Sequence, residues 1–321
     1  AVVTYSPSYT VVPTFECFNA CAYCNFRAPR GHARAAWLTG AEARRCLEAV
    51  AARGADVREV LVLGGEVHPG SRRRGAWLEL AVEICELARA LGFLPHTNIG
   101  PLTREEMARL GAVNASMGLM LEQASQRLFR ARDGPYARGA PSKDPALRLR
   151  QLDMAGELRI PFTTGVLVGI GESEAEVWET LDAIACSQRR FGHIQECIVQ
   201  PYRPGARDTW APGAAYDLAE LPAVVAQARA RLPAEVAVQV PPNLVRERPD
   251  VLRACLDAGA SDLGGVSPRD EVNPEYDFPT HEALAAQLRD WGYELRPRLA
   301  VHERLSPWAF AGAGLPPSAG A

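Results

Sequence analysis

Short apolar runs alternate with amphipathic stretches along most of the chain. Residues 59–63 (Glu-Val-Leu-Val-Leu) form a run typical of a parallel strand that is covered on both faces. Before it, apolar positions recur with helical spacing; Thr39 is a candidate N-cap for that helix, and Gly54 ends it. The pattern predicts a regular succession of strands and helices.

This succession continues to the C-terminal part of the chain. The expected strands are 9–15, 59–63, 93–98, 113–119, 162–168, 194–199, 236–240 and 262–266. The expected helices are 39–53, 76–91, 103–110, 145–158 and 174–190, with further helical stretches before the last two strands. Eight such pairs favour an α/β fold, a closed (β/α)8 TIM-type barrel whose active site lies at the C-terminal ends of the strands. An open doubly wound sheet is the alternative, although no GxGxxG follows the first strand.

Length and composition suit one large α/β barrel domain or two ordinary domains. The chain has 321 residues, of which 47% are hydrophobic and 23% charged. We expect the barrel to span residues 1–310 and the Gly/Pro/Ala-rich tail, 311–321, to be flexible. A net charge of −3 with scattered Arg residues argues against nucleic acid as a partner. No apolar run approaches the roughly 20 residues of a membrane helix and no signal peptide is visible, so we expect a cytoplasmic protein without a membrane partner.

Three of the eight Cys residues form a CxxxCxxC motif after the first predicted strand, at Cys17, Cys21 and Cys24. A four-iron, four-sulfur cluster takes four Cys ligands, but the next residue of this type, Cys46, falls inside a predicted helix. One iron would therefore have no Cys ligand. The alternative is a structural zinc site with His32 as the fourth ligand, although zinc motifs usually pair two ligand dyads.

Glycine and polar residues gather at the predicted strand ends. Glycine lets a ligand approach the backbone closely, but it is also common in turns. Oriented amide, hydroxyl and guanidinium groups suit a polyhydroxylated chain or a pyrimidine ring, and ordinary loop polarity is the alternative. The strand-end residues are Gly64, Gly65, Glu66, His96, Asn98, Ser116, Glu122, Gly165, Gly169, Gly171, Gln200, Tyr202, Arg203, Gln239, Asn243, Ser267 and Asn273.

Together these segments resemble the CofG family, the radical S-adenosylmethionine (SAM) subunit of the deazaflavin chromophore (FO) synthase. The resemblance covers nearly the whole chain. It departs from many relatives at Phe18 and Ala20, where basic side chains are expected, and at Gly65 in the Gly-Glu element. The segments that carry it are 4–7, 15–26, 94–98, 114–122, 143–148, 160–165, 193–196, 239–243 and 264–268.

The resemblance implies a [4Fe-4S] cluster held by Cys17, Cys21 and Cys24, with SAM bound at the open iron. It implies SAM contacts from Tyr23, Gly64, Gly65, Glu66, Ser116, Glu122, Gly165, Gly169 and Gly171. Substrate contacts are expected from His96, Asn98, Gln200, Tyr202, Arg203, Gln239, Asn243, Ser267 and Asn273. The candidates for acid or base work are His96, Glu122 and Tyr202.

The implied reaction is closure of the deazaflavin ring in a tyrosine-derived ribityl-uracil adduct, with loss of ammonia and use of a 5′-deoxyadenosyl radical. The implied partners are a CofH-type subunit that supplies the adduct and a reductant protein. Two alternatives stay open: a radical SAM transferase that joins tyrosine to the ribitylamino-uracil, and a non-enzymatic iron-sulfur or zinc protein.

Overall fold

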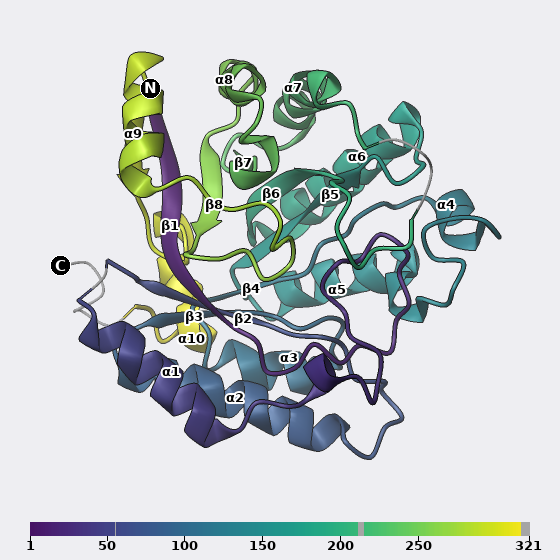
Figure 1. Ribbon diagram of the computed structural model, residues 1–321, viewed down its shortest axis with the longest axis vertical. Helices are drawn as coiled ribbons and strands as arrows, with labels where there is room; N and C mark the ends of the chain where they lie inside the picture. The colour runs from purple at the N-terminus through teal and green to yellow at the C-terminus, as the bar shows by residue number, and fades with distance from the viewer. Residues whose placement is uncertain (55, 211–214, 316–321) are drawn as a thin grey trace.

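The computed structural model describes residues 1–54, 56–210 and 215–315, and in these ranges eight parallel strands close into a barrel (Figure 1). The strands are β1 (Val2–Val11), β2 (Glu59–Leu63), β3 (Leu94–Asn98), β4 (Ser116–Gly118), β5 (Phe162–Val168), β6 (Ile194–Pro201), β7 (Ala237–Gln239) and β8 (Asp262–Val266). Neighbours follow chain order from β2 to β8, and β1 pairs with both β8 and β2. The two pairings of β1 close the sheet, which confirms the predicted single α/β barrel domain and excludes the open doubly wound sheet.

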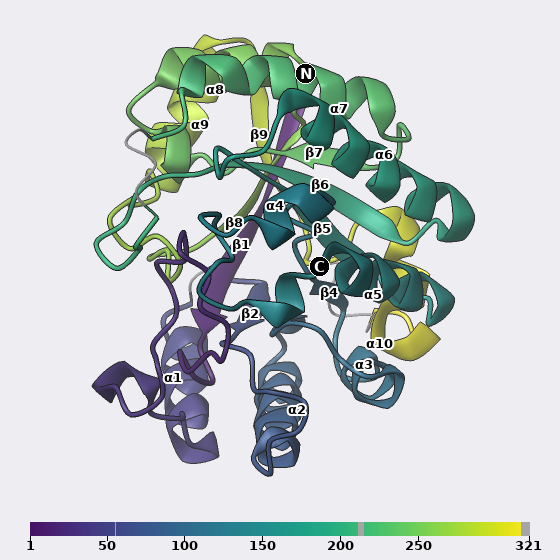
Figure 2. The same ribbon diagram turned by 90° about the vertical axis from the view of Figure 1, so that its right-hand side faces the viewer.

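Helices surround the barrel, as Figures 1 and 2 show from two directions. They are α1 (Gly40–Ala52), α2 (Arg74–Ala90), α3 (Arg104–Gly111), α4 (Gln126–Arg130), α5 (Pro145–Glu157), α6 (Glu174–Phe191), α7 (Leu221–Arg231), α8 (Pro249–Asp257), α9 (His281–Asp290) and α10 (Ala309–Gly312). Short 3-10 helices occupy Ala33–Ala35, Pro141–Lys143, Leu218–Glu220, Asn243–Val245 and Glu303–Trp308. Thr39, Thr103 and Ser173 form capping boxes that start α1, α3 and α6.

The predicted position of the first strand was wrong. We expected residues 9–15, whereas β1 begins at Val2 and ends at Val11. Its first half looked like a polar lead-in because Ser6 and Thr4 carry hydroxyl groups. Inside the barrel these hydroxyls donate to buried carboxylates, Ser6 to Glu59 and Thr4 to Asp262. Strands β4 and β7 are also shorter than predicted.

A ninth strand, β9 (Glu294–Pro297), was not predicted and pairs with β1 at Val2–Tyr5, outside the eight-stranded ring. After it the chain returns to the barrel, and α10 packs beside α3. Leu315 packs against a cluster that contains Phe310, so ordered packing continues past the boundary expected at residue 310. Residues 316–321 of the predicted tail lie outside the described residues.

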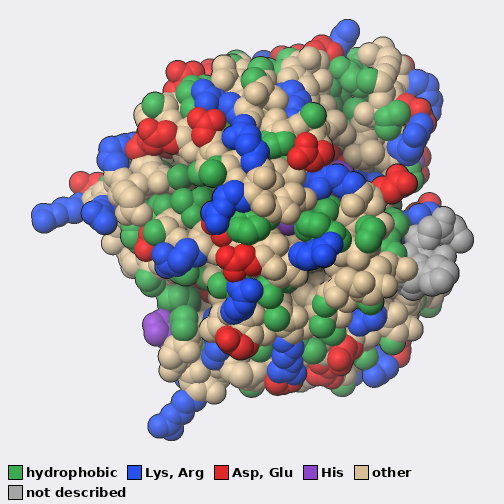
Figure 3. All heavy atoms as spheres, turned by 180° about the vertical axis from the view of Figure 1, so that it is seen from behind, with side chains coloured by type: hydrophobic (Ala, Val, Ile, Leu, Met, Phe, Trp, Pro, Cys, Tyr) green, Lys and Arg blue, Asp and Glu red, His purple; other side chains and the backbone are tan. Residues whose placement is uncertain are grey.

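The main core lies between the strands and the helices that cover them. Trp77 and Ile84 of α2 and Leu181 of α6 are completely buried in it. On the face seen in Figure 3, basic and acidic side chains are interspersed, and exposed ion pairs such as Arg190–Asp153 link neighbouring helices. Within the described residues, no helix combines the length and apolar character needed to cross a membrane.

Candidate active site

The loop after β1 places all three motif cysteines at the mouth of the barrel. Figure 2 shows this purple segment and α4 in front of the strands. Cys17, Cys21 and Cys24 line one cavity of about 330 Å³. The loop is held by backbone hydrogen bonds: Ala20 N donates to Gly139 O at 2.7 Å, and Ala22 N donates to Pro135 O at 2.8 Å. The loop is therefore anchored on both sides of Cys21.

In the described residues none of the eight cysteines forms a disulfide. Burial raises the pKa of Cys17 to about 11 and that of Cys21 to about 12. Thiols with such pKa values stay protonated at neutral pH unless a metal ion displaces the proton. Cys46, Cys85 and the remaining cysteines lie away from this cavity, so three thiols beside an open space are the available donor set. This set fits a four-iron cluster with one iron left for another ligand.

A single zinc ion fits these cysteines less well. Tetrahedral zinc holds sulfur at about 2.3 Å, so its ligand atoms lie roughly 4 Å from one another. In the described part of the chain, Cys17, Cys21 and Cys24 do not form a trio of ligand atoms within 4.8 Å, and neither does any trio with His32. His32 is exposed, and its Nδ1 accepts a hydrogen bond from Arg34 N at 3.1 Å. A metal cluster larger than one ion suits this spread of thiols better.

The Gly64-Gly65-Glu66 segment lines the cavity, as predicted for the end of β2. The cluster loop lies directly on Gly65, where a Cβ atom would be 2.1 Å from Glu16 O. The Glu66 carboxylate accepts from Asn19 Nδ2 at 2.9 Å and also from the Ser142 hydroxyl. Glu66 O accepts from Phe18 N at 3.1 Å. This segment therefore braces the cluster loop in addition to lining the cavity.

Gly165 within β5 and the two glycines after it have structural causes that the sequence did not reveal. A Cβ atom at Gly165 would lie 2.4 Å from Ile198 O of β6. Gly169 and Gly171 have φ values of 97° and 101°, which side chains disfavour. The Glu172 carboxylate completes the turn by accepting from Gly169 N at 2.5 Å. None of the three glycines lines the cavity, where β5 contributes Leu167 instead.

Glu122 and Tyr23 do line the cavity. Glu122 adopts a left-handed backbone conformation, with φ of 62°, which costs a non-glycine residue about 1 kcal/mol or more and is often found at functional sites. Its carboxylate accepts from Lys143 Nζ at 2.6 Å. The Lys143 ammonium also lies 5.9 Å from the centre of the Tyr23 ring. The Tyr23 hydroxyl is buried without a hydrogen-bond partner in the described residues.

The predicted substrate residues fall into three groups. The cavity beside the three cysteines is called the upper cavity. Five of the predicted residues line it: Asn98, Gln200, Tyr202, Arg203 and Asn273. His96, Asn98 and Gln239 line a second cavity deeper in the barrel. Asn243 and Ser267 line neither, because Asn243 Nδ2 donates to Asp270 and Ser267 Oγ donates to Arg269 O.

Tyr202 is less suited to acid or base work than its position suggested. Its hydroxyl donates to Asp208 Oδ2 at 2.8 Å. Burial and the neighbouring Asp208 carboxylate raise its pKa well above the usual range for tyrosine. The hydroxyl is therefore a proton donor that is already committed to Asp208.

The lower cavity, of about 170 Å³, continues the upper one into the barrel. Leu61, Asn98, Met120 and Ile198 line both. The two cavities thus adjoin each other, one beside the cluster loop and the other above the barrel floor.

His96 enters this lower cavity in a defined tautomer. Its Nδ1 lies 2.7 Å from Ser116 Oγ, and that hydroxyl donates to Ala300 O at 2.8 Å. Since the single hydroxyl proton of Ser116 points to Ala300, His96 Nδ1 carries the ring proton and Nε2 is an acceptor. Burial lowers the pKa of His96 to about 4, so the ring is neutral at pH 7. Ser116, predicted to contact SAM, is instead fully buried beneath the cavities as the partner of His96.

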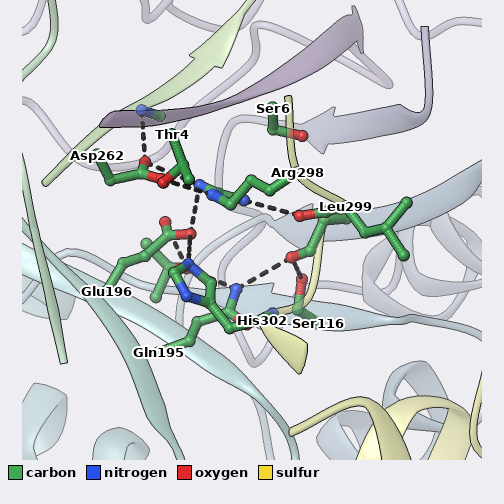
Figure 4. A network of polar contacts seen from close by, with 12 residues as sticks. Thr4, Ser6, Ser116, Gln195, Glu196, Asp262, Arg298, Leu299 and His302 are labelled. Atoms are coloured by element: carbon green, nitrogen blue, oxygen red, sulfur yellow. Dashed lines mark hydrogen bonds and ion pairs between the residues drawn. The ribbon is translucent and has the colours of Figure 1, made fainter. Parts of the chain in front are cut away.

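Charged side chains form the barrel floor (Figure 4). Arg298 donates from Nε to Asp262 Oδ2 at 2.6 Å and also pairs with Glu196. His302 Nε2 lies 2.9 Å from Glu196 Oε1. Glu196, Asp262 and His302 are spaced closely enough to hold a metal ion, but the Arg298 guanidinium already lies against both carboxylates as their cation.

Several residues of these cavities were missed at the sequence level. They are Asn19, Lys143 and Arg148 around the upper cavity and Glu59, Gln195, Glu196 and Arg298 around the lower one. Glu59 had a usable signal, because it opens an otherwise apolar strand. Arg298 had none, since it follows a strand that was not predicted.

Comparison with known proteins agrees with this geometry. Residues 11–184 match the family model of the radical SAM superfamily. The chain is 49% identical over 307 residues to the 7,8-didemethyl-8-hydroxy-5-deazariboflavin synthase of Trichodesmium erythraeum, covering 96% of this chain and 93% of that protein. It is 53% identical to the synthase of the same name from Synechocystis, with 95% of each chain covered.

Solved structures share the fold at lower identity. The FeFe-hydrogenase maturase HydG from Carboxydothermus hydrogenoformans superposes with a TM-score of 0.75 at 19% identity, covering 95% of this chain and 70% of that one. Methylornithine synthase (PylB) gives a TM-score of 0.69 at 15% identity, with 92% and 84% covered. With the near-full-length sequence matches, the chain belongs to the radical SAM superfamily and, within it, to the 7,8-didemethyl-8-hydroxy-5-deazariboflavin synthases, which are radical SAM enzymes.

Proposed function

We propose that this protein carries out the ring-closing half of deazaflavin synthesis. Its substrate is the adduct 5-amino-5-(4-hydroxybenzyl)-6-(D-ribitylimino)-dihydrouracil, and its products are the deazaflavin FO and ammonia. The observation that carries the proposal is the pair of adjoining cavities between Cys17, Cys21 and Cys24 and the barrel floor. A substrate with an aromatic group at one end and a polar chain at the other matches such a space.

We assign the cluster to Cys17, Cys21 and Cys24 and SAM to the upper cavity beside Tyr23, Gly64 and Glu122. When bound there, the cluster and SAM would supply the radical chemistry that abstracts hydrogen from the substrate. In the deeper cavity His96 Nε2 accepts a hydrogen bond from the substrate, because its ring is neutral and Nδ1 is engaged with Ser116.

Glu122 holds a different role in this proposal. Its carboxylate is paired with Lys143, and both side chains line the upper cavity. The pair offers a fixed acceptor and a fixed cation to polar groups of a ligand. A CofH-type subunit supplies the adduct, and a reductant protein supplies the electron.

One assay separates ring closure from the transferase alternative. The anaerobically reconstituted enzyme is given SAM and a reductant, once with the purified adduct and once with tyrosine plus 5-amino-6-(D-ribitylamino)uracil. The expected result is fluorescent deazaflavin from the adduct alone, with 5′-deoxyadenosine, methionine and ammonia as co-products. Coupling of tyrosine to the uracil without ring closure would assign the chain to the transferase reaction instead. A Cys17→Ala protein is the matched control for cluster-independent chemistry.

A further inference from the structure

The lower cavity exposes hydrogen-bond acceptors that have no donor in the described residues. Gln239 is 7% exposed, and its Oε1 atom is buried without a partner. Its Nε2 lies over Gly264, where a Cβ atom would be 2.0 Å away. The amide is thus held by the close approach of β8. A buried amide oxygen without a donor costs about as much as a lost hydrogen bond, which points to a ligand group that completes it.

Two further acceptors line the same cavity. Glu59 Oε2 accepts from Ser6 Oγ at 2.5 Å, while Oε1 has no hydrogen-bond partner in the described part of the chain. Burial raises the pKa of Glu59 to about 7, so Oε1 is an acceptor above that pH, where the carboxyl group is ionised. His96 Nε2 is the unprotonated ring nitrogen. A Cβ atom at Gly118 would lie only 2.8 Å from it, so glycine at this position leaves room for the ring. Three acceptors, from β2, β3 and β7, therefore converge on one small space.

The charged floor does not supply the missing donors. The Arg298 guanidinium is directed at Asp262, Glu196 and Leu299 O (Figure 4). Gln195 Nε2 donates to Ala300 O at 3.0 Å and to Thr163 Oγ1 at 3.2 Å. The floor residues Arg298 and Gln195 thus donate within the protein, and these donors do not reach the three acceptors above them.

We infer that this lower cavity is the subsite for the polyhydroxylated chain of the substrate, whose hydroxyls donate to Glu59 Oε1, His96 Nε2 and Gln239 Oε1. Each hydroxyl can donate to one neighbour and accept from another, so a polyol can satisfy several acceptors in a row. A pyrimidine ring suits this cavity less well, because its carbonyl oxygens would face these acceptors. The inference rests on the proposed function, because it names which part of that substrate lies deepest. The ring system then remains in the upper cavity, near the cluster.

Calorimetry at pH 8, where Glu59 is ionised, tests this on the reconstituted enzyme with SAM and two probes. One is 5-amino-6-(D-ribitylamino)uracil, and the other is 5-amino-6-methylaminouracil, which lacks the polyol. The wild-type protein is expected to bind the ribityl compound at least tenfold more tightly, a factor that corresponds to about 1.4 kcal/mol. Gln239→Leu removes one acceptor. In Glu59→Gln the side-chain oxygen stays where it accepts from Ser6, so the amide NH2 group points into the cavity. Each variant is expected to reduce the preference roughly tenfold.

The controls separate this inference from misfolding and from the proposed function. Affinity for SAM and for the methylamino compound should stay at wild-type values in both variants, and Glu86→Gln, on the exposed face of α2, should change nothing. Equal affinity of the wild type for the two probes, or an unchanged preference in both variants, would overturn the subsite. Failure to form deazaflavin from the adduct, with the ribityl preference intact, would overturn the proposed function alone.

Discussion

At the scale of single residues, burial shifts the pKa of three groups that line the two cavities. It raises the pKa of Cys21 to about 12 and that of Glu59 to about 7, and it lowers that of His96 to about 4. Each shift favours the neutral form, as low-dielectric surroundings require. The site without its cofactor is thus close to neutral at its thiols and histidine.

Replacement of Cys17, Cys21 or Cys24 by Ala is expected to abolish the cluster, because no other cysteine lines the upper cavity. Iron and sulfide analysis after anaerobic reconstitution, with absorption spectra, measures this. Cys46→Ala, an exposed cysteine on α1, should keep full cluster content. Normal iron content in any of the first three variants, or its loss in Cys46→Ala, would contradict the assignment.

The titration of Glu59 predicts a pH dependence of stability. Its pKa is about 7 in the folded protein and 4.5 ordinarily, so between these values the folded state holds a proton that the unfolded chain has released. The free energy of unfolding should therefore fall as pH rises through this window, by up to roughly 1.4 kcal/mol per pH unit. Glu59→Gln removes this contribution.

Urea unfolding at pH 5, 6, 7 and 8 measures the effect. Relative to wild type, Glu59→Gln should gain stability as the pH rises from 5 to 7 and change little above that. Glu86→Gln is the control on the surface. A constant difference between wild type and Glu59→Gln at all four pH values would show that Glu59 does not titrate in this window.

At the scale of elements, the end of β2 and the cluster loop act as one unit. Gly65 N donates to Thr14 O at 2.8 Å, and Trp77 Nε1 of α2 donates to Gly65 O at 3.2 Å. The loop has little regular secondary structure of its own, so these contacts determine where its cysteines lie. The Gly-Gly-Glu element thus positions the cluster ligands.

Gly65→Val is expected to displace the cluster loop, because its Cβ atom would meet Glu16 O at 2.1 Å. The forced shift should cost about 1–3 kcal/mol of stability and lower the iron content after reconstitution. Gly75→Ala, at a helical position with no atom within 4 Å of the added Cβ, is the matched control. Wild-type iron content and unfolding midpoint in Gly65→Val would show that the loop does not depend on this approach.

At the scale of the whole molecule, Arg298 joins distant parts of the chain. It follows β9, which pairs with β1, and it reaches Asp262 on β8 and Glu196 on β6. The Asp262 side chain is completely buried, and that of Glu196 is nearly so. The C-terminal segment therefore neutralises the barrel floor.

Arg298→Met should leave two buried carboxylates without their cation and destabilise the fold by about 3–5 kcal/mol. Arg296→Met, two residues earlier, breaks only an exposed pair with Glu294 and should cost about 0–1 kcal/mol. Urea unfolding of the two variants at pH 7 provides the comparison. Equal effects would mean that the floor does not depend on the Arg298 ion pairs.

The sequence by itself determined the barrel class, most helix boundaries and the three cysteines. These features are local: apolar periodicity, capping residues such as Thr39 and Ser173, and the spacing of a motif within one loop. The strands 59–63, 162–168 and 262–266 were predicted with the bounds they have in the structure. The bounds of β1 were not, because its polar face looks into a polar barrel interior.

Only the tertiary structure decided which polar residues share a cavity. Glu59, His96, Gln239 and Arg298 are far apart in the chain, and the barrel brings them together at its floor. Asn243 and Ser267 met the same sequence criteria as Gln239, yet their side chains bind their own loops. A residue's type and its place at a strand end are local properties, whereas the direction of its side chain and its partners depend on the register of the closed barrel.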